Sequence, residues 1–91
     1  MSYSAKVIVY AADDPKVLQL VRKAVEQDGA RVHEFTVRDA ADGGKELYVE
    51  LRISDSGIMS SIVRRVEAVN GAAVMAATEP HEIRLPKRIE G

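Results

Sequence analysis

Residues 45–54 have the sequence Lys-Glu-Leu-Tyr-Val-Glu-Leu-Arg-Ile-Ser, in which apolar and polar side chains alternate. This two-residue period predicts a β-strand with one face in the core and the other exposed. The core face would hold Leu47, Val49, Leu51 and Ile53, and the exposed face Glu46, Tyr48, Glu50 and Arg52. Residues 31–38 predict a preceding strand, and the Asp-, Ala- and Gly-rich residues 39–44 predict the hairpin turn between the two.

A second apolar run, Val7-Ile8-Val9-Tyr10, predicts a strand at residues 6–11 that is covered on both faces. A helix is expected to follow over residues 15–28. Asp14 can accept hydrogen bonds from the free amides of its first turn, and Pro15 suits the first helical position. Apolar side chains then recur at helical spacing until Gly29, which is typical of a residue just past a helix end.

The C-terminal half predicts a second helix and a last strand. The helix would begin at Ser56-Gly57 and end at Asn70-Gly71, and the strand would span residues 73–78. Met59 and Met75 are expected to fill the core. Residues 79–91 permit either a tail or one more short edge strand, so the domain is placed at residues 1–78.

The element order is therefore strand, helix, strand, strand, helix, strand. This order predicts an α+β fold of the ferredoxin-like βαββαβ type, with a four-stranded antiparallel sheet and two helices on one face. The expected strand order is fourth, first, third, second, which places the apolar strand at residues 6–11 in the middle of the sheet.

Composition narrows the function classes. The 91 residues carry a formal net charge of -1, so a strongly basic surface for nucleic acid is not expected. There is no cysteine, which excludes disulfides and thiolate metal sites. No apolar stretch approaches the roughly 20 residues that span a bilayer. We therefore expect a cytoplasmic protein that binds neither nucleic acid nor membrane.

Catalytic machinery is not evident in the sequence. His33 and His81 lie in unrelated settings, and His33 is expected on the core side of its strand, in step with Phe35 and Val37. The acids in the first strand–helix loop have the wrong sign to hold a phosphate. We therefore expect no enzyme activity, no metal and no cofactor. The exposed candidates for a protein interface are Tyr48, Glu50 and Arg52, because aromatic residues and arginine favour interfaces.

Three segments, residues 7–29, 32–37 and 58–76, resemble the ACT domain, a regulatory βαββαβ module. The run from Ile62 to Val74, Ile-Val-Arg-Arg-Val-Glu-Ala-Val-Asn-Gly-Ala-Ala-Val, resembles its second helix and last strand. The resemblance implies pairing between chains and, in many members, an amino acid bound between subunits at the first strand–helix loop. The family pattern there is Asp-Arg-x-Gly-Leu-Leu, whereas this chain has Asp-Asp-Pro-Lys-Val-Leu at residues 13–18 and lacks the glycine.

Two functions of different class follow. The first is a non-catalytic regulatory or assembly module that forms a homodimer or docks onto a partner or host enzyme. The alternative is an amino-acid effector domain whose ligand-binding residues would be Ala12, Asp13, Asp14, Lys16 and Val17 at a dimer interface. The altered loop favours the first, because Pro15 removes a backbone donor and helix capping accounts for the acids.

Overall fold

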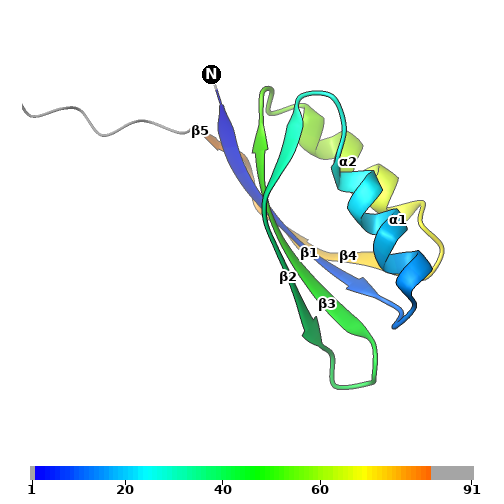
Figure 1. Ribbon diagram of the computed structural model, residues 1–91. Helices are drawn as coiled ribbons and strands as arrows, with labels where there is room; N and C mark the ends of the chain where they lie inside the picture. The colour runs from blue at the N-terminus through cyan, green and yellow to red at the C-terminus, as the bar shows by residue number, and fades with distance from the viewer. Residues whose placement is uncertain (1, 83–91) are drawn as a thin grey trace, which may run out of the picture.

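The computed structural model describes residues 2–82 and contains two helices and one antiparallel sheet, in two layers (Figure 1). In chain order the elements are β1 (Tyr3–Ala11), α1 (Pro15–Val25), β2 (Ala30–Asp39), β3 (Lys45–Ile53), α2 (Ile58–Glu67), β4 (Ala72–Ala77) and β5 (His81–Glu82). The strands lie in the order β2-β3-β1-β4, as the sequence predicts. The ferredoxin-like βαββαβ fold is confirmed.

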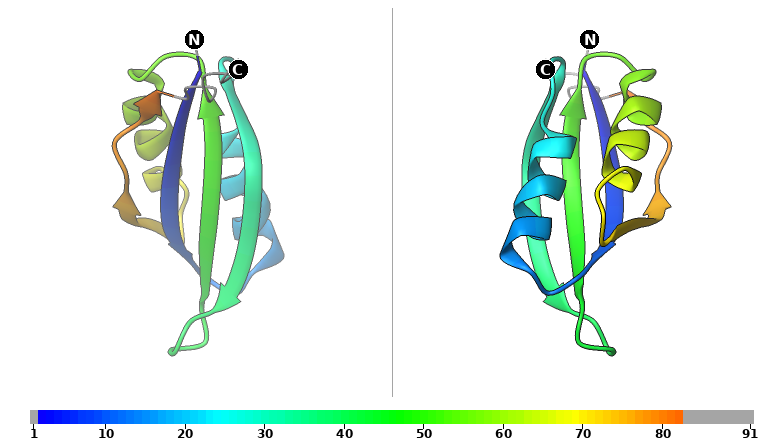
Figure 2. Two further views of the ribbon diagram at one scale, coloured as in Figure 1. Left: turned by 90° about the vertical axis from the view of Figure 1, so that its left-hand side faces the viewer. Right: turned by 90° about the vertical axis from the view of Figure 1, so that its right-hand side faces the viewer.

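Both helices cover the same face of the sheet and leave the other face open (Figure 2). The core lies between these two layers. Its fully buried side chains come from alternate positions of β1 and β3 and from the inner faces of the helices, and they include Val7, Val9, Leu47, Leu51, Val21 and Ile62. The alternation in β3 therefore has the expected cause, since every aliphatic residue of that strand faces the helices.

The centre of the sheet corrects one prediction. β1 is central, between β3 and β4, but it is not covered on both faces. Val7 and Val9 are fully buried, whereas Ile8 and Tyr10 are half-buried on the open face. An unbroken apolar run predicts burial on both faces, but in β1 apolar residues also occupy the alternate positions that face outward.

Helix α1 ends at Val25, three residues before the predicted end. The backbone then turns sharply, with Gln27 bridging to Ala30, whose amide donates to the Gln27 carbonyl at 2.9 Å. Gly29 has the predicted positive φ of 83°, but it serves this tight turn and not the helix terminus. At the other end, Asp14 caps the helix as predicted, because its carboxylate accepts from the Lys16 amide at 2.9 Å.

Two bulges overturn predictions about side-chain direction. The β2–β3 register shifts between Val32 and Glu34, so His33 is not on the core side but lies beside Glu50 on the open face. The β1–β4 register shifts between Ile8 and Val9, and Met75 is 56% exposed instead of filling the core. Met59, by contrast, is buried as expected. In each strand the extra residue of the bulge reverses the alternation.

Residues 79–91 were expected to form either a tail or a short edge strand, and within them lies the two-residue strand β5, which pairs with β1 beyond the end of β4. The rest of that prediction, residues 83–91, lies outside the described part of the chain. In the described part, neither helix is long and apolar enough to cross a membrane.

Candidate functional site

The open face of the sheet is built from four levels of side chains, each level crossing all the strands. A level is a row of side chains that lie opposite one another on neighbouring strands. The pairing of β1 with β3 defines the four levels, because Ser4, Lys6, Ile8 and Tyr10 of β1 lie opposite Arg52, Glu50, Tyr48 and Glu46 of β3. β2 adds Arg31, Glu34, Thr36 and Arg38, and the opposite edge adds His81, Thr78, Ala76 and Ala73. All the predicted interface residues therefore lie on this one face.

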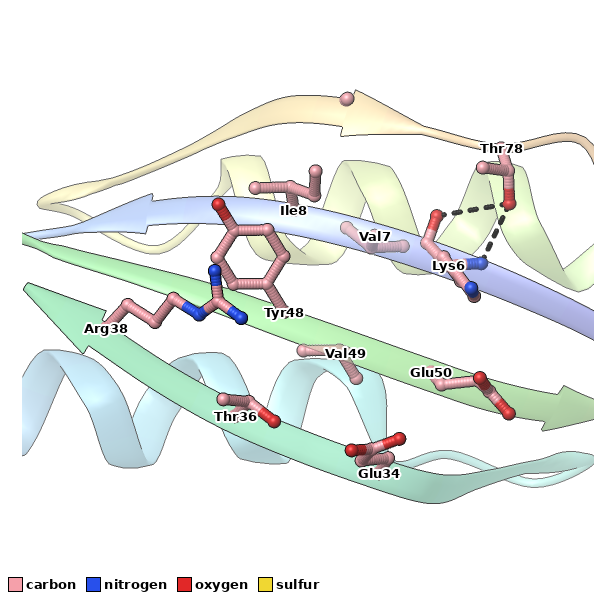
Figure 3. A pocket seen from close by; sticks show the side chains of 11 residues that line it. Lys6, Val7, Ile8, Glu34, Thr36, Arg38, Tyr48, Val49, Glu50 and Thr78 are labelled. Atoms are coloured by element: carbon pink, nitrogen blue, oxygen red, sulfur yellow. Dashed lines mark hydrogen bonds between the residues drawn. The ribbon is translucent and has the colours of Figure 1, made fainter. Parts of the chain in front are cut away.

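Tyr48 stands at the centre of the face. The Arg38 guanidinium carbon lies 4.9 Å from the centroid of its ring, within the range of a cation–π contact. Its hydroxyl donates to Glu46 Oε1 at 3.2 Å. Around it the surface is hollowed into a depression of about 300 Å³, whose lining includes Ile8, Thr36 and Ala76 (Figure 3). The centre of the open face is thus aromatic and apolar, with charged side chains around it.

Glu50 is the electrostatic centre of the next level. Arg52 Nη1 donates to Glu50 Oε2 at 2.8 Å and also to Ser4 Oγ at 3.1 Å. His33 Nε2 lies 3.7 Å from the same Glu50 oxygen. The hydrogen bond from Arg52 holds the pKa of Glu50 below its usual value, with smaller contributions from the charges of Arg52, His33 and Lys6. Glu50 therefore stays ionised at neutral pH.

Tyr10 fixes the hairpin end of the face. Its hydroxyl donates to Asp42 Oδ2 at 2.7 Å, and the other Asp42 oxygen accepts from the Gly44 amide at 3.1 Å. These contacts lower the pKa of Asp42, with the Tyr10 bond the larger cause, and the same bond raises the pKa of Tyr10. A Cβ at Gly44 would overlap the Tyr10 hydroxyl, so glycine allows Tyr10 to lie against this turn. The hairpin is therefore held against β1.

Three backbone amides of the first strand–helix loop donate within the chain. The Ala12 amide donates to the Gly71 carbonyl at 2.9 Å, the Asp14 amide donates to Ala12 at 2.8 Å, and the Lys16 amide is bound by the Asp14 cap. Val17 packs against the core, and Asp13 is exposed. The charge of Asp13 contributes to the raised pKa of Lys45, whose larger cause is a hydrogen bond to Asp39. The loop and the open face are separate candidate sites.

The described residues offer no other chemical centre. Residues 2–82 contain no group of three or more His, Asp or Glu side chains that would hold a metal ion. Within the same range, no buried side-chain nitrogen or oxygen lacks a hydrogen-bond partner. In residues 2–82, therefore, no unpaired buried polar group points to a ligand.

Sequence reasoning predicted only the β3 side of the open face as an interface and missed its other members, among them Ile8, Tyr10 and Arg38. The signal for Ile8 and Tyr10 was available in the sequence, since they continue the alternate positions of the polar residues Ser4 and Lys6. Arg38 had no such signal. Its place over Tyr48 follows from the register of β2 against β3, where Thr36 is the direct partner of Tyr48.

Comparisons with known proteins agree on the fold. No family model matches the sequence, and no curated protein matches it. Among solved structures, the chain is similar to the ACT domain of GTP pyrophosphokinase from Chlorobium tepidum, with a TM-score of 0.67 and 10% identity over 86% of this chain and 97% of that one. An uncharacterized protein from Thermotoga maritima gives a TM-score of 0.67 and 10% identity, over 88% and 98% of the two chains.

A third similar structure is the C-terminal domain of the MgtC protein from Mycobacterium tuberculosis. Its TM-score is 0.56 and its identity 18%, over 85% of this chain and 82% of that one. At sequence identities this low, the similarity establishes a shared fold and does not establish a shared ligand. The chain therefore shares its fold with the ACT domain of GTP pyrophosphokinase.

Proposed function

We propose that this chain is a non-catalytic regulatory or assembly module of ACT type that docks through the open face of its sheet. The observation that carries the proposal is the face itself, which the helices leave uncovered and which has an aromatic and apolar centre at Tyr48 and Ile8. A half-covered sheet is an ordinary arrangement, but its free face usually carries polar side chains. Here the centre is apolar, which favours an interface.

The surroundings of Tyr48 support this reading. Protein interfaces concentrate aromatic residues and arginine at a desolvated centre, with a polar rim around them. Arg38 stacks on Tyr48 at that centre, and Glu50 with Arg52 forms an ion pair toward the rim. The pair is already assembled in the isolated chain, so docking would cost little further ordering of these side chains.

The alternative, an amino-acid effector at residues 12–17, has less support. A bound amino acid would need backbone donors for its carboxylate. The amides of Ala12, Asp14 and Lys16 donate within the chain, and Pro15 has none. Asp13 would in addition repel the carboxylate. An effector that used these three amides would therefore have to displace contacts that they already make within the chain.

The test is the mass of the chain in solution, measured by light scattering across a concentration series, with and without a panel of amino acids. We expect self-association that no amino acid alters. Tyr48→Ala is expected to weaken it at least tenfold, as loss of a central aromatic anchor does. Leu20→Ala, which removes an exposed apolar side chain from the helix layer, is the matched control and should change nothing.

Two results would contradict the proposal. One is a chain that stays monomeric at every concentration. The other is association that shifts with one amino acid and loses this response in Asp13→Ala, which would move the function to the loop.

A further inference from the structure

The two outer strands of the open face differ in side-chain length. β2 presents the long side chains Glu34 and Arg38. β4 and the residue that follows it present the small side chains Ala73, Ala76 and Thr78. Figure 3 shows Glu34 and Arg38 on one side of the depression and the shorter Thr78 on the other. A flat partner would leave the space above the short side chains unfilled.

We propose that the occupant of this face is a second copy of the chain, packed face to face about a two-fold axis that runs parallel to the strands between β1 and β3. The inference rests on the proposed function and names its partner. Such a rotation exchanges β1 with β3 and β2 with β4, and it leaves each residue at its own level along the strands. The long side chains of β2 in each copy thereby cover the small residues of β4 in the other, and each contact occurs twice, as in any isologous interface.

The uncharged level at the centre fits this arrangement. Ile8 is the cross-strand neighbour of Tyr48, and both lie at the same level as Thr36 and Ala76. The rotation places Tyr48 over Ile8 of the second copy and Thr36 over its Ala76. Each contact occurs twice, and each sets a larger side chain against a smaller one. The depression around Tyr48 would be filled from the partner by the same residues that line it.

The charged level beside it fits as well. Lys6 and Glu50 are also direct cross-strand neighbours, one on each side of the axis. The rotation places Glu50 over Lys6 of the second copy, again twice. On the outer strands, Glu34 meets Thr78 of the second copy, so no acid faces an acid at this level. Opposite charges across an interface favour association and fix its register.

The other possible two-fold axis is less favourable. An axis perpendicular to the strands at the level of Tyr48 would exchange the levels on either side of it. Glu46 would then face Glu50 of the second copy, twice, and like charges so juxtaposed oppose association. Arg38 over Glu34 would be the compensating contact. The two axes therefore make different predictions for different charge pairs.

The face is large enough for a dimer. Four strands spaced about 4.8 Å apart are about 19 Å wide, and nine residues at about 3.4 Å each are about 31 Å long. Two such faces amount to about 1,200 Å² in total, which lies at the lower end of the range for specific interfaces. Aligned sheets that pack face to face also tolerate the twist of each sheet, since they cross at about 30°.

The experiment exchanges charges between copies. In Lys6→Glu, the variant residue would face Glu50 of the second copy, and in Glu50→Lys two lysines would face each other. We expect each variant alone to self-associate at least tenfold more weakly than the natural chain. In an equimolar mixture both contacts pair opposite charges, so sedimentation velocity should show a heterodimer with most of the natural affinity. Because Lys6 and Glu50 are also neighbours within one chain, only this recovery on mixing reports a contact between chains.

Glu34→Arg and Arg38→Glu form the comparison pair and should not rescue each other. Recovery in that mixture, and none with the first pair, would overturn the axis proposed here. Urea midpoints of all four variants establish that each is folded at the concentration used. If Tyr48→Ala weakens association but neither mixture recovers, the docking face stands and the two-fold pairing fails. If Tyr48→Ala has no effect either, both proposals fail.

Discussion

Replacing Gly29 with alanine perturbs the turn between α1 and β2, which sets where β2 enters the sheet. Gly29 has a φ of 83°, a left-handed conformation that a side chain disfavours. A Cβ at this position would lie 2.6 Å from Ser54 Oγ and 2.7 Å from Ile58 Cδ1. The turn is also bound to the end of β3, because the Ser54 amide donates to the Gly29 carbonyl at 2.8 Å. The methyl group therefore meets both backbone strain and a filled space.

The cost has two parts. The left-handed conformation costs about 1–2 kcal/mol for an L-residue. Overpacking against Ser54 and Ile58 adds about 1–3 kcal/mol if those side chains shift to accommodate the methyl group. Gly43 offers the matched control, since its φ is 92° but a Cβ there meets nothing within 4 Å. Gly43→Ala should therefore cost only the first part, about 1–2 kcal/mol.

Urea unfolding at equilibrium measures the difference. We expect both variants to lower the midpoint at an unchanged slope, with Gly29→Ala lowered further than Gly43→Ala. Equal destabilisation by the two substitutions would refute the argument, because it would mean that the space beside Gly29 is not filled as the structure has it.

Three other substitutions test separate parts of the fold. Asp14→Ala should lower the free energy of unfolding by about 1 kcal/mol through loss of the helix cap, with Asp13→Ala near zero, and a thermal melt that ranks them otherwise would contradict the capping role. Tyr10→Phe should raise the pKa of Asp42 toward its ordinary value, because the Tyr10 hydrogen bond is the main cause of its lowering. Since the pKa of Asp42 is lower in the folded chain than in the unfolded chain, the stability that this hydrogen bond contributes is present above about pH 3.8 and is lost as the pH falls through the pKa of the folded chain. Carboxyl NMR titration checks this, and an unchanged midpoint would argue against the hydrogen bond. Leu47→Ala should cost about 2–5 kcal/mol in urea unfolding, because Leu47 is fully buried, and a loss below about 1 kcal/mol would place it outside the core.

The strand order could be predicted because two independent constraints agree. The alternation in β3 fixes which of its faces meets the helices, and right-handed crossovers then fix where the other strands lie. The end of α1 and the start of β2 were harder to predict from the sequence. Gly29 is compatible both with a helix terminus and with a tight turn, and the bridge from Gln27 to Ala30 decides between them only in the folded chain.

The misplaced side chains share one cause. A bulge changes the parity of a strand, and the prediction for β2 took its parity from Phe35 and Val37 alone. Val32 also packs against the core, three positions before Phe35, and an odd spacing between two core residues is the signal of an inserted residue. In β4 the signal was weaker, because alanines surround Met75 and do not define a parity.

The candidate site was predictable where it depends on β3 and not where it depends on neighbouring strands. Tyr48, Glu50 and Arg52 follow from alternation within one strand. Arg38 reaches Tyr48 through the pairing of β2 with β3, and Tyr10 reaches Asp42 across the hairpin. Such cross-strand contacts depend on register, which the sequence of a single strand does not contain.

The two bulges also bear on how copies of this chain can associate. Sheets can extend by pairing edge strands, and proteins oppose this with bulges and charged residues at the edges. β2, at one edge, has its bulge at His33, with the charged residues Arg31 and Glu34 within two positions of it, and β4, at the other edge, has its bulge at Met75. A dimer formed across either edge would therefore pair through a ladder that is already interrupted. Packing through the open face leaves both edges unpaired and buries Tyr48. The two bulges, which the sequence analysis did not predict, therefore favour association through the open face and not through an edge strand.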